Sequence, residues 1–345
     1  MNKINLVSLN KDKLEALMLE LGEKKFRANQ VFEAIHKKKI DSIDDITVLS
    51  KDFRKILSEK AEIYYPEILK IFESKIDSTK KFLLKLEDGQ IIETVFMQYE
   101  GRNTICVSCQ VGCKMGCSFC ASTKAGFVRH LSVGEILSQV YVVEKALNVN
   151  INNIVFMGIG EPLDNYENII DVIYMLNHKL GKNMSQRSMT LSTSGLANKI
   201  YDLADLNLAI NLAVSFHYPF DKERSQFMPV NKRFPIKDLL KACDYYFDKT
   251  GRRVSFEYVL VDGLNDTQRH IDELHRLFKG KNIHINLIPL NEIDEFNYKS
   301  SKDKNIENFS KKLNARGINT TLRNKKGSDI DGACGQLRVN YIGEN

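Results

Sequence analysis

The first 75 residues carry apolar side chains at the spacing of amphipathic helices. Three runs with this period cover residues 11–22, 27–36 and 44–60, and lysine is frequent between the apolar positions. Apolar residues that recur every three to four positions predict helices that bury one face. We therefore expect residues 1–75 to form a small helical domain.

From Lys81 to Tyr99 the apolar positions alternate with a period of two instead. The alternation runs on both sides of Asp88-Gly89, and such a pair between alternating runs is the strongest short-range signal of a β-hairpin. The pattern predicts two paired strands within a β-hairpin connection over residues 76–100. Glu93 lies on the second of these strands.

The rest of the chain, residues 101–345, alternates between β-rich runs and amphipathic helical runs. Strands are predicted at 103–108, 153–158, 188–193, 208–216, 253–260, 284–289 and 318–323, and helices near 133–147, 166–179, 196–205, 235–249, 267–279 and 304–316. The alternation predicts an α/β fold whose strands are parallel, in a sheet or barrel, with functional residues at their carboxyl ends. About six β-α units precede the tail, fewer than the eight of a closed barrel.

Composition and charge narrow the class of protein. The chain has 345 residues, 43% of them hydrophobic, which is enough for one large core or two smaller ones. It contains no run of 18 apolar residues and begins without the features of a signal peptide, so we expect a cytoplasmic protein with no membrane span. Lysine and arginine number 50 against 44 aspartates and glutamates, an excess that is compatible with a polyanionic partner without requiring one.

Five of the seven cysteines lie within fifteen residues of the chain, from Cys106 to Cys120. Because the cytoplasm is reducing, we expect ligands, nucleophiles or buried thiols here and no structural disulfides. Cys113, Cys117 and Cys120 follow the first strand of the β-α region, and three thiolates at this spacing can hold three irons of a 4Fe-4S cluster. The fourth iron would stay open to chelate the amino and carboxylate groups of S-adenosylmethionine.

A zinc site is the alternative use of these thiols. Cys106 with Cys109, and Cys117 with Cys120, form two Cys-x-x-Cys pairs. Only seven residues separate the pairs, which is short for a zinc ribbon. The β-α units that follow favour the iron–sulfur cluster, which leaves Cys106 and Cys109 to be explained in another way.

Two further segments carry candidate chemistry. Gly160 and Glu161 follow an apolar strand, where glycine lets the backbone approach a ligand and a carboxylate can accept hydrogen bonds from an ammonium group. Cys334 lies in a polar loop between glycines and aspartates, a setting that supports a reactive role about as well as a packing role. Cys243 occupies an apolar helix position and is expected to be a buried thiol.

The spacing of the three clustered cysteines resembles the signature of the radical S-adenosylmethionine superfamily, and other segments resemble its RlmN/Cfr family of RNA methyltransferases. These segments are, in order, VSCQVGC (107–113), MGIGEPL (157–163), TLSTSG (190–195), SFH (215–217), NLIPLN (286–291) and DIDGACGQL (329–337). The resemblance covers at least residues 90–340, and the N-terminal helices are similar to the family's accessory RNA-binding domain. Gly332 stands where alanine is common, and Cys109 where serine or threonine is usual.

This resemblance implies a partial (β/α)6 barrel that binds one 4Fe-4S cluster and uses two S-adenosylmethionine molecules per turnover. One would methylate Cys334, and a radical formed from the second would remove hydrogen from that methyl group, which then adds to an adenine ring. By the same correspondence, Cys106 resolves the adduct through a transient disulfide and Glu93 accepts the ring proton. The residues implied to contact S-adenosylmethionine are Gly160, Glu161, Ser192, Ser215, Phe216, His217 and Asn291.

The implied substrates are an adenosine in the peptidyl-transferase centre of 23S rRNA and the adenosine after the anticodon of tRNA. Pro162 favours the RlmN branch, which methylates carbon 2, over the Cfr branch, which methylates carbon 8 and confers antibiotic resistance. An external electron donor such as flavodoxin and a monomeric state are also expected. Five lysines of the N-terminal domain are expected to contact phosphates: Lys24, Lys25, Lys37, Lys38 and Lys39.

Two alternatives from other functional classes stay open at this point. One is a radical enzyme that acts on a protein or a small molecule, against which the motif around Cys334 argues. The other is a non-catalytic iron–sulfur or zinc protein that binds RNA, which cleavage of S-adenosylmethionine on reduction would exclude.

Overall fold

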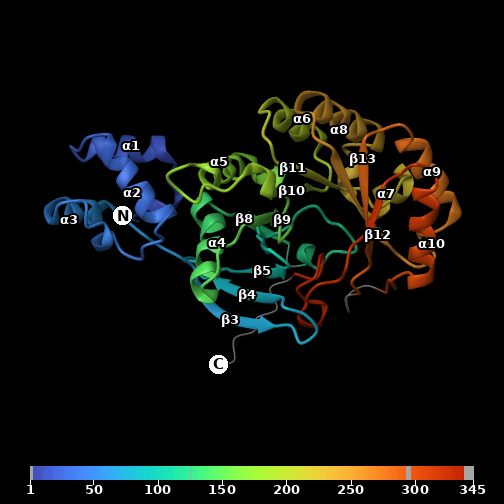
Figure 1. The fold of residues 1–345 in the computed structure, drawn as a ribbon, viewed down its shortest axis with the longest axis horizontal. Coiled ribbons are helices and arrows are strands. Elements are labelled where there is room, and N and C mark those ends of the chain that lie inside the picture. The colour runs from blue at the N-terminus through green and yellow to red at the C-terminus, as the bar shows by residue number, and fades with distance from the viewer. Residues whose placement is uncertain (1–2, 125, 293–296, 338–345) are drawn as a thin grey trace.

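The computed structural model describes residues 3–124, 126–292 and 297–337 and arranges them around one ten-stranded sheet (Figure 1). The larger part of the sheet is parallel, with neighbouring strands in chain order. Its strands are β6 (Arg102–Cys106), β9 (Asn153–Phe156), β10 (Met189–Thr193), β11 (Asn211–Ser215), β12 (Val254–Leu260), β13 (Ile283–Pro289) and β14 (Thr320–Leu322).

A helix follows each of the first six parallel strands and returns the chain to the start of the next one (Figure 1). These helices are α4 (Val133–Leu147), α5 (Tyr166–Asn177), α6 (Ala197–Asp205), α8 (Ile236–Thr250), α9 (Gln268–Phe278) and α10 (Asp303–Asn314). A shorter helix, α7 (Asp221–Phe227), precedes α8. The structure thus confirms the predicted α/β alternation and the partial (β/α)6 barrel.

Alternation along the strands separates the core from the interior of the barrel. On β10, Met189 and Leu191 are fully buried and belong to the apolar core. Thr190 and Ser192, one position along in each case, are half-buried and line cavities. Because side chains on a strand point alternately to its two faces, the apolar set meets the helices and the polar set faces inward. This polar inner face is where the candidate site forms.

The predicted hairpin continues the same sheet in antiparallel fashion. β4 (Lys80–Lys85) and β5 (Ile91–Tyr99) pair across a turn in which Gly89 has a φ of +80°, and β5 pairs with β6. A further strand, β3 (Glu67–Glu73), pairs with the outer side of β4. The expectation of a helical domain up to residue 75 is therefore wrong for residues 67–73, because pairing with a distant strand, which local helical periodicity does not reveal, fixes this segment.

The N-terminal helices α1 (Lys11–Glu20) and α2 (Phe26–His36) form as predicted. The helix expected over 44–60 is shorter, because a 3-10 turn covers Ile43–Asp45 and Ser50 caps the start of α3 (Lys51–Lys60). The three helices dock onto the barrel through α4, and their apolar residues share one continuous core with it. At the junction, Ser8 accepts a hydrogen bond from the Gly134 nitrogen at 3.1 Å, and a Cβ on Gly134 would lie 2.3 Å from the Ser8 hydroxyl. Lys39 pairs with the buried Glu144 at 2.7 Å. None of the described helices is both long and apolar enough to span a membrane.

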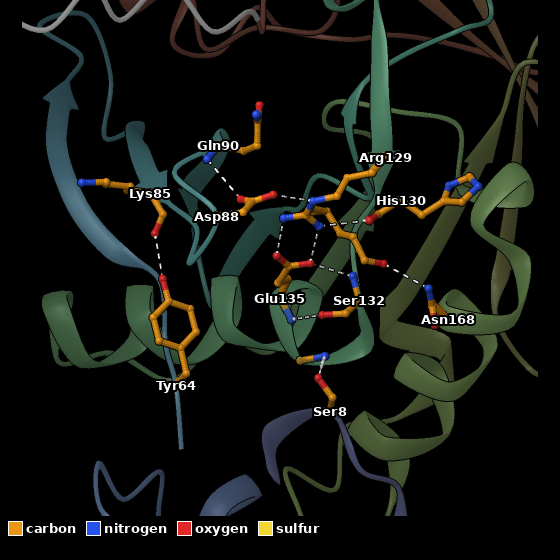
Figure 2. A network of polar contacts seen from close by, with 12 residues as sticks. Ser8, Tyr64, Lys85, Asp88, Gln90, Arg129, His130, Ser132, Glu135 and Asn168 are labelled. Carbon is orange, nitrogen blue, oxygen red and sulfur yellow. Dashed lines mark hydrogen bonds and ion pairs between the residues drawn. The ribbon is translucent and has the colours of Figure 1, made fainter. Parts of the chain in front are cut away.

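A polar network ties the hairpin turn to the start of α4 (Figure 2). Arg129 donates to Asp88 of the turn and to Glu135 of α4, each at 2.8 Å, and Glu135 forms a capping box with Ser132. Arg129 lies on β8 (Phe127–His130), which pairs with β7 (Gln110–Gly112). The sequence did not predict this short ribbon, which forms the stem of the loop that carries Cys113 to Cys120.

Candidate active site

A cavity of about 170 Å³ opens at the carboxyl ends of the parallel strands. Most of the residues that the sequence singled out come from separate β-α units and meet here. Those that line it are Cys113, Cys117, Cys120, Gly160, Glu161, Ser192, Ser215, His217, Asn291 and Cys334. Glu93 and Cys106 lie outside its lining.

The three clustered cysteines present their thiols from one loop. Cys113 and Cys117 are buried and Cys120 is half-buried, and burial raises the pKa of Cys113 to about 12. Thiols in such surroundings become thiolates when a metal centre compensates the charge. The loop is anchored by a hydrogen bond from the Ser118 nitrogen to the Phe227 carbonyl at 2.9 Å. The donor set and the adjoining cavity fit an iron–sulfur cluster with one open iron.

The alternative four-cysteine zinc site is not assembled. Within residues 3–124, 126–292 and 297–337, no group of three or more His, Cys, Asp or Glu side chains is placed to hold a single metal ion. Cys106 lines a different cavity from Cys117 and Cys120. Cys109 is buried beneath Gly160, where a Cβ would lie 2.9 Å from its sulfur.

Glu161 presents a buried carboxylate at the end of β9. It accepts hydrogen bonds from the backbone nitrogens of Ser194 at 2.7 Å and Leu163 at 3.1 Å. Burial raises the pKa of Glu161, and these hydrogen bonds offset part of that rise. Gly160 has a φ of +111°, and a Cβ there would lie 2.7 Å from Gln110, so glycine is required for the turn. These contacts hold the Glu161 carboxylate in the wall of the cavity.

His217, which follows β11, and Asn291, which follows β13, form another part of the cavity wall. His217 accepts a hydrogen bond from the Val259 nitrogen on Nδ1 at 3.0 Å, and burial lowers its pKa to about 3, so the ring is neutral. Asn291 donates to the Cys334 carbonyl at 3.0 Å. Its buried Oδ1 has no hydrogen-bond partner among the described residues. An acceptor left in this state is suited to a donor on a bound ligand.

The side chain of Phe216 does not belong to this cavity. It is fully buried and packs between Phe256 and Phe278, with ring centroids 5.6 and 5.3 Å away. Because His217 follows it in the chain and faces the cavity, Phe216 faces the core. Phe216 is not among the residues that line the cavity, so the position of its side chain does not support the expected contact with S-adenosylmethionine.

A second and larger cavity, of about 940 Å³, occupies the interior of the partial barrel. Cys106 lines it, and Cys334, Asn291 and Arg323 line both cavities. Glu257 is the one acidic residue among the described lining residues. The basic residues that line it are Arg102, Arg187, Arg252, Arg253, Arg323, Lys325 and Lys326. Cys334 thus lies where a thiol-lined cavity meets a cationic one.

Cys106 and Cys334 differ in their surroundings. Cys334 is exposed, whereas Cys106 is buried on β6. Burial raises the pKa of Cys106 to about 12, and negative charge on Cys334 raises it further. Arg323, which faces both thiols, opposes that effect. All seven cysteines are unpaired in this structure.

Arg323 and Lys81 are two candidate residues that sequence reasoning missed. Arg323 donates to Glu257 at 3.2 Å, and Asn286 donates to the other oxygen of Glu257 at 2.8 Å. Lys81 lies 3.1 Å from Glu93, which is only 2% exposed and not a surface carboxylate. The one available signal for Arg323 was its position at the end of the last predicted strand. Lys81 carried no signal beyond its place on the first strand of the predicted hairpin.

Comparisons with known proteins agree with this arrangement. Residues 4–63 match the family described as "Ribosomal RNA large subunit methyltransferase N-terminal domain", and residues 107–277 match the "Radical SAM superfamily". The first match covers α1, α2 and α3. The second begins just before the cysteine loop and extends to the end of α9.

Full-length relatives give the same assignment. A protein of Finegoldia magna named "Probable dual-specificity RNA methyltransferase RlmN" is 49% identical and covers 99% of this chain and 98% of its own length. A protein of Clostridium novyi with the same name is 48% identical, with 99% of each chain covered. The crystal structure of a radical SAM methyltransferase from Sphaerobacter thermophilus superposes with a TM-score of 0.92 at 40% identity, covering 97% of this chain and 99% of that chain. On this combined ground of sequence, fold and cysteine loop, the chain belongs to the RlmN family of radical S-adenosylmethionine RNA methyltransferases.

Proposed function

We propose that this enzyme methylates carbon 2 of an adenosine in the peptidyl-transferase centre of 23S rRNA and of the adenosine after the anticodon in tRNA. The observation that carries the proposal is the position of Cys334 between two cavities. One cavity is lined by the cysteines suited to a cluster, and the other by cations and Cys106. The name shared by the relatives, "dual-specificity RNA methyltransferase", supports two RNA substrates.

The smaller cavity is the proposed site for the cofactors. Cys113, Cys117 and Cys120 would hold the 4Fe-4S cluster, which, once reduced and with S-adenosylmethionine bound, supplies a 5′-deoxyadenosyl radical. Glu161 offers its carboxylate to the methionyl ammonium group. The unpartnered Oδ1 of Asn291 offers a further acceptor. Neutral His217 can meet the adenosyl portion without adding a positive charge beside the sulfonium.

Cys334 supplies the carbon that reaches the RNA. A direct polar transfer from a sulfonium has the wrong polarity, because carbon 2 of adenine is electrophilic. Cys334 therefore first receives a methyl group from one S-adenosylmethionine, and this group loses a hydrogen atom to a radical from a second. The resulting S-methylene radical adds to the ring. The adduct must then give the ring proton to a base and one electron to an acceptor, a role that the oxidised cluster left after cleavage of S-adenosylmethionine would serve.

In this proposal, Cys106 releases the product from the adduct. Its thiolate forms a disulfide with the Cys334 sulfur while the bond from that sulfur to the methylene breaks. The electron pair of the broken bond stays on the methylene carbon, which takes up a proton and becomes the methyl group. Glu93, on the strand next to Cys106, is the proposed acceptor of the ring proton.

The larger cavity is the proposed entry for the target nucleotide. An adenine inside folded RNA must leave its stack to reach Cys334, and the neighbouring phosphates then need counter-charges. Three arginines line this cavity at the amino ends of the strands. Arg187 and Arg253 precede β10 and β12, and Arg102 is the first residue of β6. These residues can neutralise phosphates while the base extends toward the carboxyl ends of the strands.

Nucleoside mass spectrometry of 23S rRNA and tRNA tests this function directly. Cells that carry the gene should contain 2-methyladenosine in both RNAs, and cells without it should lack the modification. Restoring the gene with Cys334→Ala should not return it. Formation of 8-methyladenosine would contradict the assigned ring position, and RNA that is unchanged by loss of the gene would contradict the substrate class.

A further inference from the structure

Lys81 is a lysine that the fold removes from water. Its side chain is 8% exposed, and its ammonium lies 3.1 Å from the Glu93 carboxylate and 3.4 Å from the Asp331 carbonyl oxygen. It also lies 5.1 Å from the centre of the Phe72 ring. Lysine is almost never fully buried unless it is paired, since taking an ammonium out of water costs several kcal/mol. Both of its polar partners belong to the region around Cys334 and Cys106.

The strand register places Lys81 on the reactive face of the sheet. Leu83 pairs with Glu93, Lys81 with Val95, and Val95 with Cys106. Residues directly opposite one another share a face, and so do residues two positions apart. Lys81, Glu93 and Cys106 therefore lie on the same face, over which Leu337 packs against Val95 and Cys106.

The second contact of Lys81 reaches the loop that carries Cys334. Asp331 lies three residues before Cys334 and adopts a left-handed φ of +50°. The loop is also held from outside, because Asp329 accepts hydrogen bonds from Ser74 at 2.7 Å and from the Lys75 nitrogen at 2.8 Å. These outer contacts are exposed to solvent, whereas the Lys81 contact is part-buried. Lys81 and Asn291, which donates to the Cys334 carbonyl, thus hold the loop from the inside.

We infer that Lys81 is a positioning residue that keeps Glu93 ionised and ties it to the Cys334 loop during proton removal. The inference rests on the proposed function, in which Glu93 is the base. In the step concerned, the carboxylate takes the proton from the ring carbon, and the electron pair of the C–H bond stays in the ring. Glu93 becomes a neutral acid and Lys81 remains an ammonium.

The loss of the cation that pairs with Glu93 should change the pH dependence of this step. The titratable groups that face this region are Lys81 from β4, Cys106 from β6, and Asp331 and Cys334 from the loop. Arg323, which directly follows β14, is a second cation and acts on Cys106 and Cys334. Lys81 is the cation that lies 3.1 Å from Glu93. A buried carboxylate that loses the cation beside it favours the protonated form, which cannot act as a base. Replacing Lys81 should therefore move proton removal to higher pH.

The test follows one turnover of protein that already holds its cluster and a methylated Cys334. It is mixed with an rRNA fragment, S-adenosylmethionine and a reductant between about pH 6 and 9. Denaturing gels then measure the protein that is covalently linked to RNA, and mass spectrometry measures methylated adenosine. The Lys81→Met variant should form the linked species as wild type does but resolve it about tenfold or more slowly near neutral pH. Its rate should rise only at higher pH.

Matched variants separate this role from general damage. Lys81→Arg keeps the cation and should recover most of the rate, while Lys81→Gln should show the same displacement to higher pH as Lys81→Met. Lys80→Met is the control, because Lys80 lies next along β4 and pairs with Glu73 at 2.6 Å. It should behave as wild type. Adding Lys81→Met to Glu93→Gln should slow resolution no further, because both changes act on one step.

Two results would overturn the inference. One is a wild-type rate and pH profile in Lys81→Met and Lys81→Gln. The other is slower formation of the linked species with an unchanged pH profile, which would make Lys81 a structural residue only. Absence of any linked species from every variant, Cys106→Ala included, would contradict the proposed function and the role of Lys81 with it.

Discussion

At the scale of single residues, the seven thiols lie in three kinds of surroundings. Cys113, Cys117 and Cys120 line the smaller cavity. Cys106 and Cys334 line the larger cavity, and Cys109 and Cys243 are buried and line neither of these two cavities. We expect the three groups to differ in their chemical roles.

Substitution of the cysteines tests the division. Cys113→Ala, Cys117→Ala and Cys120→Ala should each abolish the iron-dependent colour and all methyl transfer, because three thiolates are needed to hold the cluster. Cys109→Ser and Cys243→Ser should keep both, although some stability is lost by placing a hydroxyl in a buried site. Iron and sulfide analysis with visible absorption measures the outcome. A full complement of iron in any of the first three variants would contradict the ligand assignment.

The residues found from sequence are those in local motifs. Glu161 and Cys334 stand out because neighbouring glycines and spacing mark them. Lys81, Arg323 and Arg224 could not be found in this way, since their partners lie on other elements. Arg224 is fully buried and donates to the carbonyls of Ser194 at 2.6 Å and Ser215 at 3.0 Å, which fixes two strand ends at the cofactor cavity. Burial lowers its pKa to about 10.

The spacing of apolar residues predicted the helices and strands that local sequence determines. The hairpin and the six β-α units form where the alternation of apolar residues indicated. β7 and β8 were missed because they are short, with three and four residues. β3 has seven residues and was missed because its pairing with β4, which local periodicity does not reveal, defines it. Gly112 shows the constraint, since a Cβ there would lie 1.7 Å from the Gly126 carbonyl oxygen. The close contact between Gly112 and Gly126 exists only once β7 and β8 have paired, so it cannot be predicted from either segment alone.

The docking of α2 on α4 predicts a dependence of stability on pH. His36 is fully buried beside the Tyr141 hydroxyl at 3.0 Å, and burial lowers its pKa from 6.5 to about 3. The folded state therefore holds His36 neutral, while the unfolded chain takes up a proton below about pH 6.5. The free energy of unfolding is therefore highest above about pH 6.5 with respect to His36, and it falls as the pH is lowered toward 3, because only the unfolded chain gains the proton.

A comparison of wild type with His36→Leu measures this effect. Between pH 7 and pH 5, protonation of His36 in the unfolded chain should cost wild type about 2 kcal/mol of unfolding free energy. The variant should lose less unfolding free energy over the same interval, because it lacks His36. It should still lose some, because the pKa of His217 is lowered in the same way. Denaturant unfolding at the two pH values gives the numbers. Equal losses in both proteins would show that His36 does not couple to folding.

Across the whole molecule, the N-terminal domain shares one continuous apolar core with the barrel. Phe32 of α2 and Tyr141 of α4 belong to the same apolar cluster. Deleting the domain would expose that cluster and confound any RNA-binding measurement. Lys39 is half-buried and pairs with the buried Glu144, whereas the other four expected lysines, Lys24, Lys25, Lys37 and Lys38, are exposed. Two of these four are in surface ion pairs, Lys25 with Glu15 at 3.8 Å and Lys37 with Glu33 at 3.0 Å.

Neutralising these four lysines in the intact chain tests the contribution of the domain to RNA binding. The quadruple glutamine variant should bind the rRNA fragment more weakly, and the slope of log affinity against log salt should become shallower by about 0.7 to 0.9 for each phosphate that is no longer neutralised. The unfolding midpoint should stay close to that of wild type, since the four side chains are exposed. An unchanged salt slope would place RNA binding elsewhere.

The central claim is that Cys334 carries the methyl group and Cys106 releases it. Cys334→Ala should stop the reaction before any adduct forms, whereas Cys106→Ala should permit addition to RNA and block its resolution. The Cys106→Ala protein should therefore accumulate covalently attached to RNA, in an amount that depends on an intact Cys334 and cluster.

Denaturing electrophoresis of purified Cys106→Ala protein, with and without ribonuclease, measures this directly. A slower band that ribonuclease shifts back is expected in Cys106→Ala protein, and it should be absent from the Cys106→Ala/Cys334→Ala double variant. If Cys106→Ala protein that contains its cluster shows no nuclease-sensitive band, Cys106 is not the releasing thiol. The larger cavity would then need another route of release, with Cys109 as the first thiol to test.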